Sequence, residues 1–523
     1  MAPLTFHAGM ALLKDQNYAE AHSQSLAAIR KNIRDPLPYF ILGKIAFEHD
    51  NLRKAKELFS KSVEYDPVEI YARVHLAKTL SALAQHNAAK THADRAVNIG
   101  VEDAYLADTL GVVYSRAGYH QLAIPLFKKA VNAFPDHANL QYNLASSAQF
   151  SADFEVARNG YLKTIELEPN NYRAWTSLVS LDKQSEENNV LDELTGLFEG
   201  AGDNAEAKLQ LGHAIAKTLE DLGRYEESLA WLIRGKAAKR EQLRFDRNSG
   251  AEMFAAARQT FTDKTNPPGS ELSDTPIFII GLPRTGTTLV DRIISSHSKA
   301  VSAGELTMFS ELIKFSAESP SNQVMDGATF RAAAKLSCDT LEDIGRTYIE
   351  ETKDRAQGSA FMIDKMPLNC FYAGLIHRAL PNARIIALRR GAMDSCLSNF
   401  RQMFSSQFSY YNYTLDLDDT AWFYRQFDGL IDHWRTVLPP DRFTEVRYED
   451  IVFDQENQTR RLLDFCGLDW EEACMRFHEN AAPVSTASSV QVRQPLYSGS
   501  IGRWKKYGNK LDDLKAALGG LTD

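Results

Sequence analysis

A glycine-containing segment in the second half of the chain has the composition of an anion-binding loop. Residues 281–288 (GLPRTGTT) follow the apolar run PIFIIGL and lead into the apolar-periodic stretch LVDRIISSH. At a strand–loop–helix junction the backbone N–H groups point at one anion, and the helix dipole adds partial positive charge. The hydroxyls of Thr287 and Thr288 add donors, and Gly286 lets the backbone come close. The segment therefore predicts a cradle for a phosphate-like group.

The cation of this loop separates two kinds of chemistry. A nucleotide triphosphatase loop, G-x-x-x-x-G-K-[ST], has a lysine at the position that Thr287 occupies here. The cation is instead Arg284, whose guanidinium can bind a terminal anionic group through two hydrogen bonds. Without the lysine, Mg-nucleotide hydrolysis loses its usual phosphate clamp. The run AFMID (residues 360–364) resembles a Walker-B strand, so a P-loop kinase or triphosphatase stays an alternative.

Two further segments place polar residues where predicted strands end. In RGAMDSCLS, Arg390 and Ser398 stand eight residues apart across a strand-to-helix junction. A strand-end guanidinium and a hydroxyl near the helix start can converge on one phosphate. Lys365 follows the AFMID strand, at the carboxyl edge where α/β sheets bind their ligands. We expect these groups to meet the loop at one edge of a sheet.

Together these segments resemble the sulfotransferases that use 3′-phosphoadenosine 5′-phosphosulfate (PAPS). PRTGTT (283–288) is similar to their 5′-phosphosulfate loop, and the Arg390 and Ser398 pair has the spacing that binds the 3′-phosphate. GSIGRWKKY (499–507) resembles the glycine and tryptophan segment that closes over the donor. The likeness covers about residues 275–508. The resemblance implies a donor site made by Arg284, Thr285, Gly286, Thr287, Thr288, Arg390, Ser398, Arg493, Gly502, Trp504 and Lys505.

The closest resemblance is to the tyrosylprotein branch, in which helical repeats precede the catalytic domain. It implies direct in-line transfer of a sulfuryl group from PAPS to a hydroxyl of a protein, carbohydrate or small molecule. Arg284 would hold the transferring group, Lys365 would offset charge on the leaving phosphate, and Glu305 would accept the proton; His297 is the competing base. No metal is expected, because the cations are side chains. The usual Asp-Pro after the phosphate-binding arginine is replaced by Gly391 and Ala392.

The elements that must position these residues read as an α/β domain. Apolar, β-rich runs at 276–282, 360–364, 383–389 and 442–448 alternate with helical stretches, and 299–305 is a candidate fifth strand. This alternation is typical of a central parallel sheet covered by helices. The aromatic stretch at 404–424 is a candidate lip for the acceptor, and a mobile lid or a packed helix pair explains it equally well.

The first half of the chain is a repeat. Small residues recur every 34 residues in two series, and 34 residues is the tetratricopeptide (TPR) period. We therefore predict five TPR-like repeats over residues 2–171, stacked into an all-α solenoid whose groove binds a protein or peptide partner. The first series is Gly9, Gly43, Ala77, Gly111 and Ala145; the second is Ala21, Ala55, Ala89, Ala123 and Ala157.

Length and composition agree with a multidomain globular protein. The 523 residues are 44% apolar and 24% charged, and a domain takes roughly 150 residues. We expect TPR helical repeats at 1–204, a helical cap and linker at 205–270, and a sulfotransferase domain at 271–523. The net charge of −9 gives no overall basic field for nucleic acid.

Cysteine usage and hydropathy bear on the compartment. The five cysteines are odd in number and all lie in the second half, which favours a reducing compartment over a disulfide framework. No apolar run approaches the roughly 18 residues of a membrane-spanning helix. We expect a cytoplasmic protein without a membrane span. A third possibility, besides the two enzyme classes, is an interaction scaffold whose second domain is inactive.

Overall fold

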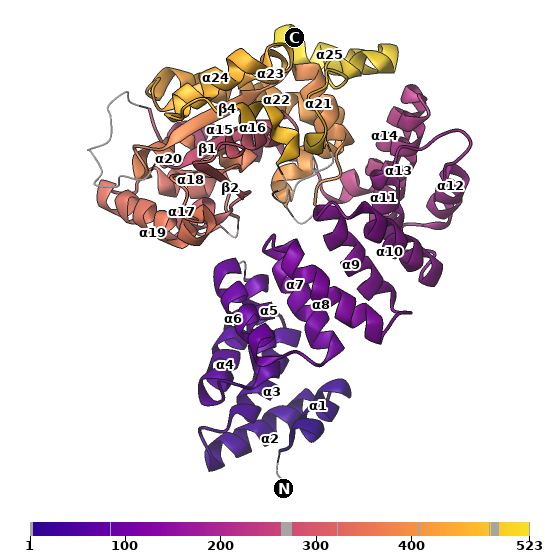
Figure 1. Ribbon diagram of the computed structural model, residues 1–523, viewed down its shortest axis with the longest axis vertical. Coiled ribbons are helices and arrows are strands. Elements are labelled where there is room, and N and C mark those ends of the chain that lie inside the picture. Colours follow the sequence, from indigo (N-terminus) through magenta and orange to yellow (C-terminus); the bar gives the residue numbers. More distant parts are fainter. Residues whose placement is uncertain are drawn as a thin grey trace. The chain divides into compact units, whose positions relative to one another are not determined.

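The computed structural model describes residues 4–83, 85–262, 275–321, 323–405, 408–480, 482 and 491–521. The chain divides into two compact units, residues 1–181 and 182–523. Figure 1 shows the course of the chain through both. The linker expected at 263–274 lies outside the described residues. Among the helices that the structure describes, none is long and apolar enough to cross a membrane.

Unit 1 is a stack of antiparallel helix pairs, as the repeat predicts. The first helices of successive pairs, α3, α5, α7, α9 and α11, begin at residues 36, 70, 104, 138 and 172, which are 34 residues apart. The structure thus confirms the solenoid of TPR-like repeats. The helices are α1 Phe6–Lys14, α2 Tyr18–Lys31, α3 Pro36–Glu48, α4 Leu52–Tyr65, α5 Ile70–Ala82, α6 His86–Ile99, α7 Ala104–Arg116, α8 His120–Ala133, α9 Ala138–Phe150, α10 Phe154–Leu167 and α11 Tyr172–Leu181.

The recurrent small residues allow the two helices of each pair to approach closely. A Cβ atom at Gly111 of α7 would lie 2.5 Å from Cε1 of Phe127 on α8. At Gly43 of α3 it would lie 2.7 Å from Cδ1 of Phe59 on α4. Since both phenylalanine rings are buried, a larger residue at either glycine would force the helices apart.

Unit 2 begins with four helices that precede the sheet: α12 Leu191–Gly200, α13 Ala205–Asp221, α14 Tyr225–Gln242 and α15 Arg247–Arg258. Helices α13 and α14 form a hairpin with backbones in contact, because a Cβ atom at Gly212 would lie 2.6 Å from the Cα of Gly235. Leu232 of α14 and Phe254 of α15 belong to the same buried cluster as Phe278 of the central strand. The hairpin is therefore packed into the core of unit 2.

The sheet has five strands, as predicted: β1 Ile277–Gly281, β2 Ala300–Gly304, β3 Phe361–Asp364, β4 Arg384–Arg389 and β5 Phe443–Arg447. Their order is β2-β3-β1-β4-β5, and all four neighbouring pairs are parallel. β1 is buried along its whole length. A continuous apolar run is what a strand covered on both faces requires.

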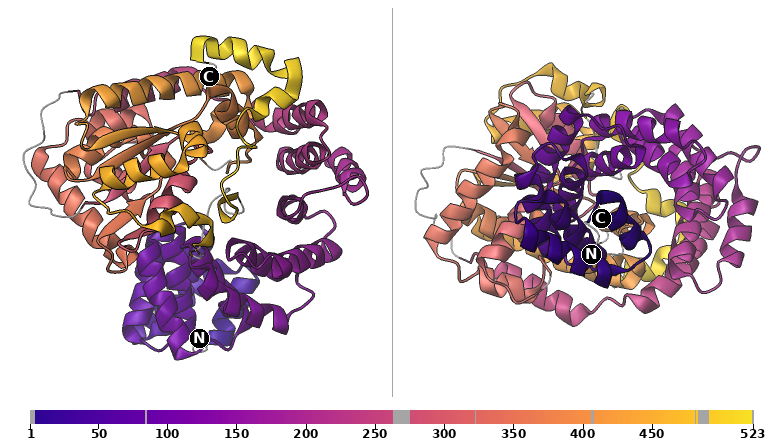
Figure 2. Two further views of the ribbon diagram at one scale, coloured as in Figure 1. Left: turned by 45° about the horizontal axis from the view of Figure 1, so that its top comes forward. Right: turned by 90° about the horizontal axis from the view of Figure 1, so that it is seen from below.

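Helices cover both faces of this sheet (Figure 2). Phe278 and Ile280 of β1 face one buried cluster, whereas Ile277 and Ile279 face the other, which is the alternation expected along a strand. The α-helices that follow β1 are α16 Thr287–Ser295, α17 Met308–Ser316, α18 Gly327–Ala333, α19 Cys338–Ala356, α20 Ala373–Ala379, α21 Ala392–Arg401, α22 Leu417–Val437, α23 Tyr448–Phe453, α24 Gln455–Cys466 and α25 Asp512–Leu518. Short 3-10 helices are η1 Pro367–Phe371, η2 Ser409–Leu415, η3 Glu472–Glu479, η4 Gln491–Arg493, η5 Arg503–Leu511 and η6 Gly519–Leu521.

The strand order creates a crevice at the carboxyl edge of the sheet. From β1 the chain first builds β2 and β3 on one side, and then β4 and β5 on the other. Strands β1 and β4 are neighbours, and the connections that leave them run to opposite sides of the sheet. Such a switch point is where open α/β sheets bind their ligands, and it is where the predicted loop and the Arg390 segment lie.

Candidate active site

The loop between β1 and α16 adopts a conformation that few residue types accept. Gly286 has φ +104°, and a Cβ atom there would lie 2.6 Å from Cδ2 of Tyr448, so both the backbone and the space call for glycine. Arg284 also has a positive φ, +68°, which is costly for a residue with a side chain. The buried hydroxyl of Thr285 donates to the carbonyl of Leu282 at 2.7 Å and closes the loop.

The predicted second anion-binding segment holds this loop in place. Asn399 of α21 donates its amide to the carbonyl of Pro283 at 2.9 Å and accepts the hydroxyl of Tyr413 at 2.9 Å. Arg390 donates from Nη1 to the carbonyl of Arg284 at 3.1 Å. Since the bonds to Pro283 and Arg284 join segments more than 100 residues apart in sequence, they tie the loop to α21 and to Arg390 before it.

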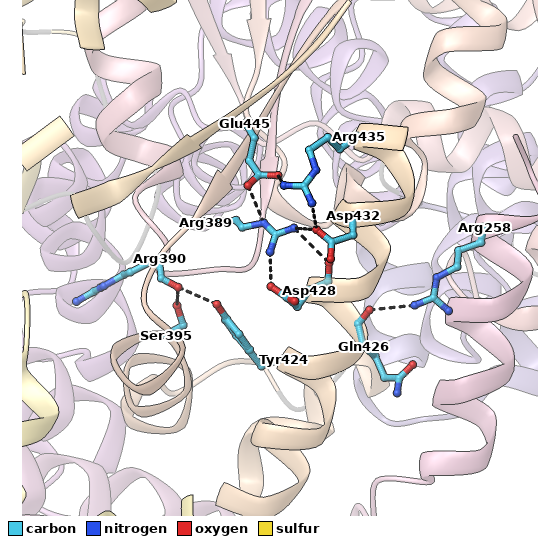
Figure 3. A network of polar contacts seen from close by, with 10 residues as sticks. All are labelled: Arg258, Arg389, Arg390, Ser395, Tyr424, Gln426, Asp428, Asp432, Arg435 and Glu445. Carbon is cyan, nitrogen blue, oxygen red and sulfur yellow. Dashed lines mark hydrogen bonds and ion pairs between the residues drawn. The ribbon is translucent and has the colours of Figure 1, made fainter. Parts of the chain in front are cut away.

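At the end of β4, two consecutive arginines point in different directions (Figure 3). Arg389 enters a carboxylate network, with Asp432 at 2.6 Å, Glu445 at 3.1 Å and Asp428. Arg390 points away from this network, and its carbonyl accepts the hydroxyls of Tyr424 at 2.8 Å and Ser395 at 3.1 Å. Arg389 thus fixes the strand end, and Arg390 is left to face the crevice.

The buried guanidinium of Arg390 is held from several sides. Its Nη2 donates to the carbonyl of Ser500 at 2.5 Å, and its centre lies 4.9 Å from the ring centroid of Tyr448. The Tyr448 and Ser500 hydroxyls are in turn 2.6 Å apart. Tyr448 of α23 and Ser500 of the carboxyl-terminal segment therefore fix the cation of Arg390, directly after β4, at the cavity.

A cavity of about 310 Å³ lies at this edge of the sheet. It brings together seven of the residues singled out in the sequence, from three different segments. Four arginines reach it, two of which the sequence did not single out, Arg401 and Arg503. Phe404, Ser405 and Tyr411 of the aromatic stretch also line it. The seven are Arg284, Gly286, Thr287, Thr288, Glu305, Arg390 and Ser398.

The neighbouring positive charges affect the pKa of Arg284. Burial, together with the cations of Arg401, Arg390 and Arg503, lowers the pKa of Arg284 to about 10. Guanidinium groups gathered in this way repel one another, and a multivalent anion between them would relieve that repulsion. The cavity is therefore electrostatically suited to a ligand that carries several negative charges.

A carboxylate and an ammonium group meet at the end of β3. Lys365 is almost completely buried and forms an ion pair with Glu305, whose side chain is 37% exposed. The backbone of Lys365 donates to the carbonyl of Gly304 at 2.9 Å, and this bond ties β3 to the segment that carries Glu305. Glu305 lines the cavity, whereas Lys365 is not among its lining residues.

Asp364, next to Lys365, is a buried carboxyl with three donors. It accepts the hydroxyl of Tyr348 at 2.8 Å, the amide of Asn369 at 3.4 Å and the N–H of Leu306 at 3.4 Å. Burial raises the pKa of Asp364 to about 7, although these hydrogen bonds act in the opposite direction. This group anchors the turn after Glu305 and does not itself line the cavity.

Other residues that the sequence predicts to bind the sulfuryl donor do not line the cavity. Gly502 and Trp504 donate backbone N–H groups to the carboxylate of Asp394 at 2.6 and 3.2 Å. Asp394 lines the cavity on α21, so these bonds dock the segment that carries Lys505. Arg493 in η4 is also outside the lining, while its neighbours Val492 and Gln494 are part of it.

Both ring nitrogens of His297, the competing base, form hydrogen bonds with residues that do not line the cavity. Its Nδ1 accepts the N–H of Lys299 at 3.0 Å, so Nε2 is the nitrogen that donates to the carbonyl of Asp469, also at 3.0 Å. The ring is buried and does not line the cavity. Over the part of the chain that the structure describes, no group of three or more His, Cys, Asp or Glu side chains is placed to hold a metal ion.

The two unpredicted arginines differ in how far sequence could have revealed them. Arg401 lies three residues after Ser398 and seven after Asp394, which is helical spacing, and all three line the cavity. That periodicity was available in the sequence. Arg503 stands between Gly502 and Trp504 in the quoted segment, but only the folded chain shows which of its residues turn inward.

Comparison with known proteins agrees with the geometry of unit 2. Residues 276–472 match the model of a family described as "Sulfotransferase family", so unit 2 contains a domain of that family. An uncharacterized protein of Aquifex aeolicus (strain VF5) is 25% identical over 390 residues, 74% of this chain and 51% of its own length. A protein-tyrosine sulfotransferase of Drosophila melanogaster is 21% identical over 243 residues, 44% of this chain and 46% of its own length. The chain thus spans about half the length of the curated relatives it matches.

Solved structures of repeat proteins are similar to part of the chain. YrrB, described as a TPR protein with an unusual peptide-binding site, is 16% identical with a TM-score of 0.29, over 39% of this chain and 96% of its own. PilF of Pseudomonas aeruginosa is 19% identical with a TM-score of 0.31, over 40% of this chain and 92% of its own.

Proposed function

We propose that this chain is a PAPS-dependent sulfotransferase that transfers a sulfuryl group to a hydroxyl acceptor. One observation carries the proposal: the Arg284 loop and the Arg390 and Ser398 pair, far apart in sequence, line a single cavity that also contains Glu305. Two separated anion sites suit a donor with charge at both its 5′ and its 3′ positions. The sulfotransferase-family match over 276–472 supports the same class of reaction.

The donor would bind across the crevice between β1 and β4. Arg390 and Ser398 would hold the 3′-phosphate, while Arg284, Thr287, Thr288 and the N-terminus of α16 would hold the 5′-phosphosulfate. Thr285 and Gly286 shape that loop. The segment with Gly502, Trp504 and Lys505, docked on Asp394, would close over the nucleotide, with Arg493 as a further phosphate partner.

The reaction would be a direct in-line displacement at sulfur. The acceptor oxygen forms a new S–O bond as the bond from sulfur to the bridging phosphate oxygen breaks, and adenosine 3′,5′-bisphosphate leaves. Glu305, which lines the cavity and forms an ion pair with Lys365, takes the acceptor proton. Arg284 and Lys365 offset the charge on the leaving oxygen. Donors fixed before the reaction stabilise such charge without reorganisation.

Ligand-dependent thermal stability tests this proposal against the kinase or triphosphatase alternative. A ligand that binds only the folded state raises the melting temperature. We expect adenosine 3′,5′-bisphosphate to do so in the absence of Mg²⁺. Stabilisation by Mg-ATP alone would instead indicate a P-loop nucleotide enzyme. Incubation with PAPS labelled in the sulfuryl group would then identify the acceptor among protein, carbohydrate and small-molecule fractions.

Unit 1 would recruit the acceptor or a partner protein. Its stacked helix pairs form the kind of extended surface that repeat proteins use to bind peptides. A cytoplasmic location fits five cysteines that are all free thiols in the structure. Binding of the bisphosphate without transfer to any hydroxyl acceptor would favour the scaffold alternative.

A further inference from the structure

A buried carboxylate outside the sheet reaches two of the cavity arginines. Glu220 lies near the end of α13 and its side chain is only 4% exposed. It forms ion pairs with Arg401 and with Arg503, whose Nε is 2.7 Å away. Tyr507 donates its hydroxyl to the same carboxylate at 3.0 Å. One side chain thus joins α13, α21 and the carboxyl-terminal segment.

We infer that Glu220 is a positioning residue for the donor site, and that the α13–α14 hairpin is therefore part of the catalytic apparatus. This inference rests on the proposed function. Glu220 does not line the cavity, whereas Arg401 and Arg503 do. Its role would be to hold these two guanidinium groups, from segments about 100 residues apart, in the orientation that receives the anionic donor.

The electrostatics of Glu220 agree with a fixed counter-charge. Burial raises the pKa of a carboxyl group, yet Arg401 and Arg503 outweigh that effect and lower the pKa of Glu220. The carboxylate therefore stays ionised between them. Four arginines converge on the cavity, and mutual repulsion would drive unrestrained guanidinium groups toward solvent when no ligand is bound.

A second contact from the same hairpin reaches the residues on either side of Arg401. Lys236 of α14 is buried, and its ammonium group donates to the carbonyl of Thr414 at 2.8 Å and to that of Gln402 at 3.5 Å. The same group lies 4.7 Å from the ring centroid of Phe400. Gln402 follows Arg401 directly and lines the cavity. The hairpin thus holds both the arginine and the backbone that follows it.

Removal of Glu220 should change the affinity for the bisphosphate in opposite directions, depending on whether Glu220 positions the arginines or acts only through its charge. A negative charge near an anion site weakens anion binding, so removal of Glu220 by charge alone would strengthen the binding of the bisphosphate. If Arg401 and Arg503 instead lose their orientation when Glu220 is removed, binding of the bisphosphate becomes weaker. Hydrogen bonds to charged groups are among the stronger ones in proteins, so the positional loss is expected to prevail.

The test compares Glu220→Gln with Glu206→Gln in the full chain. Glu206 is a matched control, because it is an exposed carboxylate of α13 that pairs with Lys239 of α14 at 2.9 Å and does not line the cavity. We expect Glu220→Gln to weaken adenosine 3′,5′-bisphosphate binding about tenfold or more by calorimetry, equivalent to one charged contact. KM for PAPS should rise in parallel, Glu220→Asp should restore part of the affinity, and Glu206→Gln should match the wild type.

The outcomes distinguish the inference from the function on which it rests. If wild-type protein binds the bisphosphate and a folded Glu220→Gln variant binds it equally well or more tightly, the positioning role is wrong. If folded wild-type protein does not bind it, the proposed function fails, and the inference fails with it. Should Glu220→Gln not fold, Tyr507→Phe decides: it removes one hydrogen bond to Glu220 and no charge, so unchanged affinity would also overturn the role.

Discussion

At the scale of single residues, Arg284 combines a backbone cost with the chemical role that we propose for it. Its φ of +68° is unfavourable for any side chain, and glycine would relieve that cost by about 1 kcal/mol. We predict that Arg284→Gly keeps or raises the melting temperature while turnover falls by about 10²–10³, the usual effect of losing one charge-stabilising donor. Calorimetry and steady-state kinetics measure the two effects separately.

Gln357 provides the control for the backbone part of that prediction. It ends α19 in the left-handed conformation with φ +50° and does not line the cavity. Gln357→Gly should therefore also keep or raise the melting temperature, while turnover stays unchanged. If Arg284→Gly lost stability and activity together, the loop arginine would be holding the fold, and its assignment to the transferring group would be wrong.

Two residues, Glu305 and His297, are candidates for the base that accepts the proton, and substitutions at each distinguish them. Glu305 lines the cavity, whereas both ring nitrogens of His297 are already hydrogen bonded outside it. Glu305→Gln should lower kcat by about 10²–10⁴, the usual contribution of a general base, with little change in bisphosphate affinity. His297→Gln should leave kcat within a few-fold of the wild type. The reverse pattern in a kinetic comparison would make the histidine the base.

The sequence could identify the residues of local motifs and not those contributed by distant segments. Arg284, Arg390 and Ser398 are recognisable because each stands at a strand-to-helix junction whose geometry is set by neighbouring residues. Glu220 has no such signal, since its partners Arg401 and Arg503 lie about 180 and 280 residues further along the chain. The role that we infer for it depends on contacts that form only when α13, α21 and the carboxyl-terminal segment meet in the folded chain.

At the scale of elements, the end of β3 should make stability depend on pH. The folded-state pKa of Asp364 is about 7, above the value of about 4 expected in the unfolded chain. The folded form therefore holds a proton that the unfolded form has released. The contribution of Asp364 to stability is therefore fully present below about pH 4 and is lost as the pH rises through about 7.

Replacing the titrating group tests this dependence. Asp364→Asn should flatten the decline in the free energy of unfolding between pH 5 and pH 7, measured by denaturant titration at several pH values. Asp339→Asn, at an exposed position in the first turn of α19, should leave the slope unchanged. An identical slope for wild type and Asp364→Asn would mean that the buried carboxyl does not hold this proton.

The elements themselves were the most predictable feature of the sequence. All five strands were expected within one or two residues, because each is a short apolar or β-rich run between polar turns, and the TPR-like helices follow a fixed period. The sequence could not show that α13 and α14, which look like one more helix pair, join the buried core of unit 2 through Ala216, Leu229 and Leu232. Gly212 and Gly235 suit any close helix pair and do not specify the neighbour.

At the scale of the whole molecule, helices α13, α14 and α15, which fall in the predicted cap and linker at 205–270, belong to the same compact unit as the sheet. Contacts divide the chain after residue 181. The four helices before the sheet bring Phe254 within 4.8 Å of Phe371 and 5.0 Å of Phe423, measured between ring centroids. They also carry Glu220 and Lys236, whose partners Arg401 and Gln402 line the cavity. A fragment that lacks them would expose core surface and lose both contacts.

We therefore predict that a fragment of residues 182–523 folds and binds adenosine 3′,5′-bisphosphate with the affinity of the full chain. A fragment of residues 271–523 should be poorly soluble or bind at least about tenfold more weakly, because it lacks the charged contact of Glu220. Solubility, thermal melting and calorimetry on both fragments measure this. Equal affinity in the shorter fragment would place the donor site wholly within residues 271–523 and make the α13–α14 hairpin dispensable.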